Sequence, residues 1–227
     1  MNGKSYFYQH IDDLDKIAKQ YREKHDIASA RLETAKQKFD RVKADRTSSE
    51  DKRLIAQAEL REAKAEHKRA MEEISTGIDR EIGALRKNFE THMMEFFAAR
   101  PEKVDQAAVS LMASGIMTAS DLAVLANQHA GNPTMLRLIA DHVQKMNEGR
   151  SAALMDRDAE AVRAKIVRFC STKERMMVFA SAEQVVRYSV DDRYGRAGVF
   201  QKEWDTKFYP SVKQQMIEMD SFSAMEG

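Results

Sequence analysis

The stretch VKADRTSSEDKRLIA, residues 42–56, interrupts a regular pattern of apolar residues and decides how the amino-terminal part of the chain folds. Upstream of it, apolar positions recur at alternating steps of three and four, the spacing of a helix that packs on another helix along a narrow seam. Continued through the stretch, the same phase would bury Arg46, Ser49 and Arg53, and burial of unpaired polar side chains is costly. The pattern therefore favours a reversal of the chain at residues 46–49 over one long continuous helix in a parallel coiled coil.

A second apolar seam begins after the stretch and faces the first one when the chain is folded back. Small residues then lie opposite large ones, as close antiparallel packing requires: Leu32 faces Ala63, and the numbers of facing residues total about 95. We expect an antiparallel helical hairpin, an arm, with a loop of roughly three residues. The main residues of the arm seam are Leu14, Tyr21, Leu32, Phe39, Leu60, Ile74, Ile78 and Leu85.

Thr47 and Ser48 mark the expected start of the second helix. Each is followed three positions later by an acidic residue, Glu50 or Asp51, which is the pattern of a capping box. No glycine follows the first helix, which counts against a tight reversal. The continuous helix therefore stays open as the alternative.

The composition predicts an all-α protein with no sheet of consequence. Only 9 of 227 residues are glycine and 3 are proline, while good helix formers are abundant. The 37 basic and 36 acidic residues nearly cancel, so the chain as a whole has no attraction for nucleic acid or for an anionic membrane. A single cysteine, Cys170, is read as a buried inert thiol and suits a reducing compartment. No apolar run approaches the roughly 20 residues that cross a bilayer, and we expect a protein of the cytoplasm.

Changes in the pattern divide the chain into three consecutive predicted domains. Residues 1–98 form the arm, residues 99–149 form a small bundle of three short helices, and residues 150–227 form carboxy-terminal helices that pack on this base. The last predicted helices are split at Pro210, and residues 220–227 are expected to be a flexible tail.

Helix-start residues support the elements after the arm. Thr118 with Asp121 forms a capping box, and Asn132 precedes a proline at the first helical position. A longer helix is expected to begin at Ser151, and another one to begin after Ser171.

No motif of the known catalytic or cofactor-binding kinds occurs in the sequence, and we expect a protein that is not an enzyme and holds no metal and no cofactor. His25 and His67 fall in the arm seam, where two histidines could form a metal site or a pH switch. In the predicted register they lie about three residues apart along the arm, which favours two partly buried seam residues.

Arginine dominates the basic residues between positions 150 and 196, where ten bases stand against seven acids. Such a region could bind phosphate or an acidic protein surface, although ordinary solvated charge explains it equally well. The candidate partner-binding residues are Arg157, Lys165 and Arg168 on one predicted helix face, and Arg193, Tyr194 and Arg196 in a loop.

The segment SGIMTASDLAVLANQHAGNPTMLRLIADHV, residues 114–143, resembles proteins encoded by phages and prophages of Gram-positive bacteria, in which short helices follow a charged coiled-coil region. The resemblance rests on Asn132, Pro133, Thr134, Met135 and Leu136 and carries over no functional residue. Because genes of this kind often lie among head-assembly genes, the resemblance implies a scaffold or another virion component.

Three functions follow from these patterns. The first is a structural or assembly protein, of phage origin, that forms homo-oligomers through the arm in the host cytoplasm or the virion. The second is a phage-encoded inhibitor or adaptor that binds a host protein. The third, which the balanced net charge does not favour, is a nucleic-acid-associated protein that uses the arginine-rich region.

Overall fold

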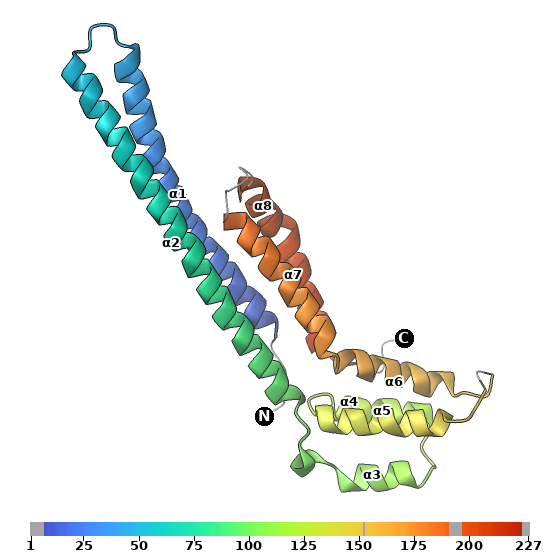
Figure 1. The fold of residues 1–227 in the computed structure, drawn as a ribbon. Coiled ribbons are helices and arrows are strands. Elements are labelled where there is room, and N and C mark those ends of the chain that lie inside the picture. Colours follow the sequence, from blue (N-terminus) through green and yellow to red (C-terminus); the bar gives the residue numbers. More distant parts are fainter. Residues whose placement is uncertain (1–6, 152, 191–196, 224–227) are drawn as a thin grey trace. The chain divides into compact units, whose positions relative to one another are not determined.

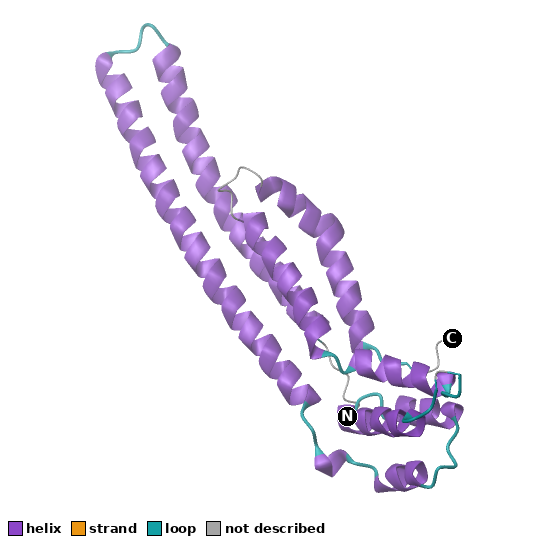
Figure 2. Cartoon of the chain, turned by 45° about the vertical axis from the view of Figure 1, so that its right-hand side comes forward, coloured by secondary structure: helices purple, strands orange, loops and turns teal. Residues whose placement is uncertain are grey.

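The structure is a computed structural model, and it describes residues 7–151, 153–190 and 197–223. Helices account for most of this part of the chain (Figures 1 and 2), and none of the described residues lies in a strand, which confirms the all-α class. The α-helices are α1 (Tyr8–Ala44), α2 (Glu50–Phe97), α3 (Gln106–Ala113), α4 (Ala119–Gln128), α5 (Pro133–Asn147), α6 (Arg157–Phe169), α7 (Thr172–Val190), α8 (Ala197–Glu203) and α9 (Tyr209–Asp220). A 3-10 turn, η1 (Pro101–Lys103), and a π-helix, η2 (Trp204–Phe208), complete them.

None of the helices in the described part of the chain has the length and apolar content that crossing a bilayer requires.

The chain divides into two compact units rather than into three consecutive domains. The first unit contains Met1–Ile11, Lys87–Ser181 and Pro210–Gly227, and the second contains Asp12–Arg86 and Ala182–Tyr209. The predicted boundaries at residues 98 and 149 therefore differ from the observed division. The physical reason is that α2 and α7 each contribute residues to both units, and α7 contains neither glycine nor proline that would signal the change.

In the second unit, α1 and α2 run antiparallel and are joined by a turn at residues 45–49, which overlaps the predicted turn (Figure 1). The ammonium group of Lys38 lies 2.6 Å from a carboxylate oxygen of Glu59 across the arm, and the Tyr21 ring contacts Gly77. The two residue numbers of each facing pair add up to 97 and 98 instead of the predicted 95. The turn contains five residues where about three were expected, which shifts the register.

Asp45 organises the turn. Its Oδ1 accepts hydrogen bonds from the Thr47 amide at 2.8 Å and the Thr47 hydroxyl at 2.7 Å, and its Oδ2 accepts one from the Ser48 hydroxyl at 2.9 Å. These donors lower the pKa of the Asp45 carboxyl. Because both predicted capping hydroxyls bind Asp45, the cap of α2 is Ser49, whose oxygen accepts from the Lys52 amide at 3.4 Å.

The predicted arm seam is unevenly buried. Its members near the base of the arm are enclosed, whereas those nearer the turn are partly exposed to solvent. The buried members are Leu14, Tyr21, Ile74, Ile78 and Leu85, and the partly exposed members are Leu32, Phe39 and Leu60.

Additional helices explain why the base of the arm is better buried. Trp204 of η2 is fully buried, and its indole N–H donates to the carboxylate of Asp15 on α1 at 3.0 Å. Arg22, one of the few buried charged residues, donates to both carboxylate oxygens of Asp205 at 3.0 Å. These contacts place a third helical layer on the arm up to about Arg22, and no such contact is recorded beyond it among the described residues.

In the first unit, α6 packs with α4 and α5, so the bundle extends beyond the predicted residues 99–149. The predicted caps at Thr118 and Asn132 are confirmed: Thr118 forms a reciprocal capping box with Asp121, and the Asn132 side chain accepts from the Met135 amide at 3.3 Å. The sequence also placed a cap at Ser171, whose hydroxyl oxygen accepts from the amide of residue 174 at 3.4 Å.

The helix expected from Ser151 begins six residues later, at Arg157. Asp156 is its cap and accepts from the Ala159 amide at 3.0 Å, while the Asp156 amide donates to the side-chain oxygen of Asn147 at 3.1 Å. Asp156 caps α6 and is hydrogen-bonded to Asn147 of α5, so α6 begins directly after Asp156 and not at Ser151.

The sequence predicted that Pro210 splits two helices, and this prediction is wrong. It lies at the second position of α9, directly after η2, where the Tyr209 amide donates to the Trp204 carbonyl five residues earlier. A proline lacks an amide donor, and it is tolerated here because it follows a turn in which the hydrogen-bond ladder has already shifted.

The predicted flexible tail is packed at its beginning. A carboxylate oxygen of Asp220 accepts from the Tyr8 amide at 3.1 Å, and the Phe222 ring meets the Phe169 ring edge-on at 5.4 Å. Residues 224–227 of the predicted tail lie outside the described residues.

Candidate functional site

A groove of about 820 Å³ opens in the second unit between α2 and the last turns of α7. Positions on α2 and α7 that recur at helical spacing line it, and α1 contributes one side chain. The lining residues are His25, His67, Lys68, Met71, Glu72, Ile74, Ser75, Ile78, Asp79, Gln184, Arg187, Tyr188 and Val190.

The floor of the groove is apolar and one wall is aromatic. Ile74 and Ile78 are buried members of the arm seam whose other face lines the groove. Tyr188 is 41% exposed and stacks on Phe200 with ring centroids 5.6 Å apart. Most of the lining residues are polar or charged, so the groove combines apolar side chains with many polar groups, and a concave surface of this kind can receive a ligand or a partner side chain.

Arg187 of α7 lines the groove. Its guanidinium forms an ion pair with Asp79 of α2 and donates to Glu183 of α7 at 3.0 Å. Partial burial lowers the pKa of Arg187 from its ordinary value, but the side chain stays a cation at neutral pH. The ion pair joins α7 to α2 beside the groove.

His25 and His67 both line this groove and are both half-buried, which agrees with their interpretation as partly buried seam residues. Nδ1 of His25 lies 3.4 Å from a carboxylate oxygen of Asp26, in an exposed contact. In the part of the chain that the structure describes, no three His, Cys, Asp or Glu side chains are placed to hold a metal ion. The two histidines are therefore wall residues of the groove in this structure.

The distal arm, residues 23–73, is the second candidate surface. The structure describes all of these residues, and Ala56 is the only one among them that is buried. Apolar side chains are exposed as well as partly exposed here: Ile27 is 51%, Leu54 is 57% and Ile55 is 59% exposed. Beyond the groove, whose α7 side faces His25, His67 and Met71, the seam belongs to two helices alone and is mostly partly exposed.

Three of the six predicted partner-binding residues lie on one face of α6, in the first unit. Arg157 and Arg168 are exposed and Lys165 is partly buried, at spacings of about two and three helical turns. Lys165 also lines a shallow groove of about 260 Å³ against α4. Arg193, Tyr194 and Arg196 lie outside the described residues, so the structure does not place the two groups together.

Other bases of the arginine-rich stretch are engaged inside the protein. Arg175 is fully buried, Arg187 pairs with Asp79, and Arg163 pairs with Glu160 on the same helix. Fewer cations are available to a phosphate backbone than the sequence count suggests, which weakens the nucleic-acid hypothesis.

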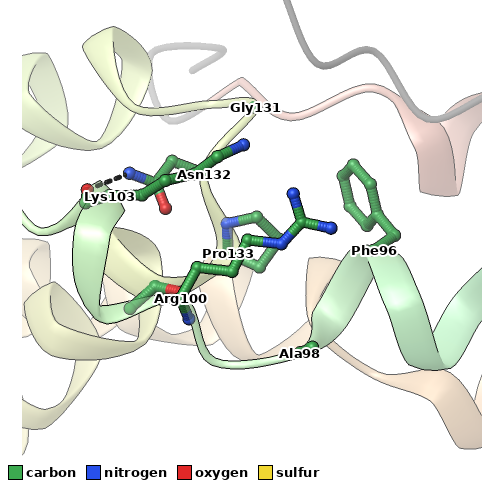
Figure 3. A pocket seen from close by; sticks show the side chains of 8 residues that line it. Phe96, Ala98, Arg100, Lys103, Gly131, Asn132 and Pro133 are labelled. Carbon is green, nitrogen blue, oxygen red and sulfur yellow. Dashed lines mark hydrogen bonds between the residues drawn. The ribbon is translucent and has the colours of Figure 1, made fainter.

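The Asn-Pro-Thr turn of the phage resemblance forms a junction in the first unit (Figure 3). Asn132 donates its side-chain amide to the Lys103 carbonyl at 2.7 Å, and the Arg100 amide donates to the Thr134 hydroxyl oxygen at 2.9 Å. Figure 3 shows the Arg100 side chain passing Pro133 toward Phe96 beside a pocket of only about 120 Å³. The side chains of this turn bind the segment before α3 to the start of α5, which is a structural role.

Comparison with known proteins identifies no relative: no family model, no curated protein and no solved structure matches the chain.

Proposed function

We propose that the chain is a non-enzymatic structural protein that self-associates through its distal arm. The observation that carries the proposal is the burial pattern of residues 23–73, in which Ala56 alone is buried while the seam and nearby apolar side chains stay open to solvent. A second copy of the arm would supply the covering layer that η2 supplies near the base of the arm.

The energetic argument is one of area. Burial of apolar surface stabilises by roughly 25 cal/mol per Å², and alanine offers little such surface. Many distal seam positions are alanine or partly exposed, such as Ala28 and Ala35 of α1 and Ala63 of α2. Small residues also permit close approach of helices, so a four-helix contact between two arms would gain area at every layer.

The resemblance of residues 114–143 to phage proteins of the head-assembly type supports an assembly role such as a scaffold or a virion component. An assembly protein needs an exposed, repeated surface more than it needs a pocket, and the distal arm offers such a surface. Host cytoplasm and virion are the proposed places of action.

Sedimentation equilibrium of the full chain over a wide concentration range tests the proposal. The variant Leu54→Glu/Ile55→Glu changes two exposed side chains of the distal arm, and Met94→Glu changes a somewhat more exposed side chain of α2 outside it. We expect wild type and Met94→Glu to form oligomers and the double variant to associate at least about tenfold more weakly. A wild-type monomer at every concentration, or equal weakening by both variants, would refute the proposal.

A second candidate function is favoured by the groove between α2 and α7. Its apolar floor at Ile74 and Ile78 and its aromatic wall at Tyr188 suit the apolar ridge of an amphipathic helix from another protein, as an adaptor or an inhibitor would bind it. Affinity capture from the native host tests this function. A single stoichiometric partner that is lost with Met71→Lys, but kept with Met177→Lys on an exposed site outside the groove, is the expected result.

A further inference from the structure

Two histidines of the first unit, distinct from the groove histidines His25 and His67, lie against each other. Nε2 of His10, in the first turn of α1, lies 3.0 Å from Nδ1 of His92, near the end of α2, and the ring centroids are 5.3 Å apart. This is the distance of a hydrogen bond between the two imidazoles. The bond joins residues 7–11, the beginning of the described chain, to the carboxy-terminal part of α2.

Aromatic side chains surround the pair. The Phe7 ring lies 4.5 Å from the His92 ring, and the Phe89 ring lies 5.3 Å from the His10 ring, measured between centroids. Phe7 and Phe89 are both fully buried. In such surroundings a hydrogen bond is strong and a charge is poorly solvated, so the protonation state of the pair has a large effect on its stability.

The bond tolerates only some protonation states. An imidazole–imidazole hydrogen bond needs one nitrogen that carries a proton and one with a free lone pair. Two neutral rings satisfy this condition, and so does a pair that shares one extra proton. When both rings are cations, both facing nitrogens carry protons, so the hydrogen bond is lost and two like charges remain about 3 Å apart.

Burial and charged groups on the same two helices influence the pH at which the histidine pair takes up protons. Burial lowers the pKa of His92, and Glu95, one turn further along α2, opposes this shift weakly. On α1, Asp13 lies one turn after His10 and is bonded to Lys16 at 2.7 Å. The neutral form of His92 is therefore favoured in the folded state.

The neighbouring helices α7 and α9 contribute both signs of charge. The Arg175 guanidinium lies 5.4 Å from the centre of the Phe7 ring, and Asp220 is 3.7 Å from Arg175. Asp220 accepts from the Tyr8 amide, and the Lys213 ammonium lies 5.8 Å from the centre of the Tyr8 ring. Because the Arg175 cation is paired with Asp220, these neighbours do not compensate the repulsion between two protonated imidazoles selectively.

We propose that His10 and His92 form an acid-sensitive latch, which holds residues 7–11 on residues 89–97 of α2 at neutral pH and releases them when both imidazoles are protonated. The sign follows from linkage. A released His92 binds protons at its ordinary pKa of 6.5, above that of the latched state. The latch is therefore at full strength above pH 6.5 and weakens as the pH falls through the lowered pKa of His92.

Hydrogen exchange of the full-length chain, followed by mass spectrometry and corrected for the intrinsic pH dependence of exchange, tests the latch. We expect protection of the peptide that contains residues 7–11 to be lost progressively on acidification below pH 6.5, because the released His92 imidazole binds protons more readily than the latched one. In His92→Gln and in His10→Gln, which cannot gain the second charge, protection should not depend on pH in this range.

His142→Gln is the matched control, because His142 on α5 also has its pKa lowered by burial but is not part of the pair. This variant should keep the wild-type response of residues 7–11. Far-UV circular dichroism identifies any variant that fails to fold, and the remaining histidine variant then decides. A wild-type response that persists in both pair variants, or no response in wild type, would overturn the latch.

Discussion

The ring of Tyr21 lies across Gly77 on the facing helix of the arm. Its hydroxyl oxygen is 2.5 Å from the position that a β-carbon on residue 77 would take, and it donates to the Glu81 carboxylate at 2.7 Å. A glycine in the middle of a long helix usually weakens it, and here the missing side chain makes room for a buried tyrosine. Tyr21 and Gly77 therefore fix the register of the hairpin together.

Gly77→Ala should destabilise the protein. An added methyl group would displace the Tyr21 ring, and overpacking of this kind costs about 1–3 kcal/mol, more than the roughly 1 kcal/mol that alanine gains in helix propensity. Gly83→Ala on the same helix is the control, since no atom lies within 4 Å of its added β-carbon, and it should stabilise by about 0.5–1 kcal/mol. Urea unfolding of both variants measures the difference. Changes of the same sign would contradict the close packing of Tyr21 on Gly77.

Tyr21→Phe should lower stability at neutral pH by about 0.5–1.5 kcal/mol through loss of the hydrogen bond to Glu81. Burial and the neighbouring Glu81 carboxylate raise the pKa of Tyr21 to about 12 from an ordinary value of 10.0. The folded state therefore favours the protonated phenol, and its contribution is complete below pH 10 and is lost as the pH rises toward 12. The stability difference between wild type and Tyr21→Phe should shrink over this window in parallel urea titrations. A difference that stays constant would rule out a buried, hydrogen-bonded phenol.

Asp45→Ala should loosen the turn of the arm, because the Thr47 amide and two hydroxyls lose their common acceptor. The lowered pKa of Asp45 means that this contribution is present above pH 3.8 and disappears as the pH falls through the folded-state value. Faster amide exchange at residues 45–49 is the expected readout at neutral pH. Asp40→Ala, at an exposed site within α1, should leave this exchange unchanged. Equal exchange in both variants would show that Asp45 does not organise the turn.

Arg175→Met should be strongly destabilising, by about 3–5 kcal/mol in thermal or urea unfolding. The buried guanidinium donates to the carbonyl oxygens of Phe169, Ser171 and Met219, and an apolar side chain would leave these acceptors and Asp220 without it. Arg168→Met at an exposed site of α6 should change stability by less than about 0.5 kcal/mol. Similar losses in the two variants would mean that Arg175 is not a structural cation.

Much of the fold follows from local sequence patterns, and these parts of the fold could be predicted. The step of three and four residues and its interruption near residue 46 indicate two helices that reverse, and Thr118 with Asp121 shows where one helix starts. The register could not be obtained in the same way. It depends on Asp45, which binds the two hydroxyls that the sequence assigns to the helix cap, and so lengthens the turn.

The groove depends on contacts between distant parts of the chain, so no local sequence pattern predicts it. Arg187 and Asp79 lie on different helices, and their ion pair is one of the contacts between α7 and α2. Arg175 could have been recognised, because it shares the helical phase of the apolar residues Phe179 and Ala182 and therefore lies on the buried face of α7. The count of basic residues between positions 150 and 196 did not distinguish Arg175 from the exposed ones.

The most direct test of the central claim is hydrogen exchange of the full-length chain at low and at high protein concentration. Self-association through the distal arm predicts that amides of residues 23–73 become more protected as concentration rises, while amides of α3 to α6 do not change. Protection that rises elsewhere and leaves residues 23–73 unaffected, or exchange that is independent of concentration throughout the chain, would contradict the account.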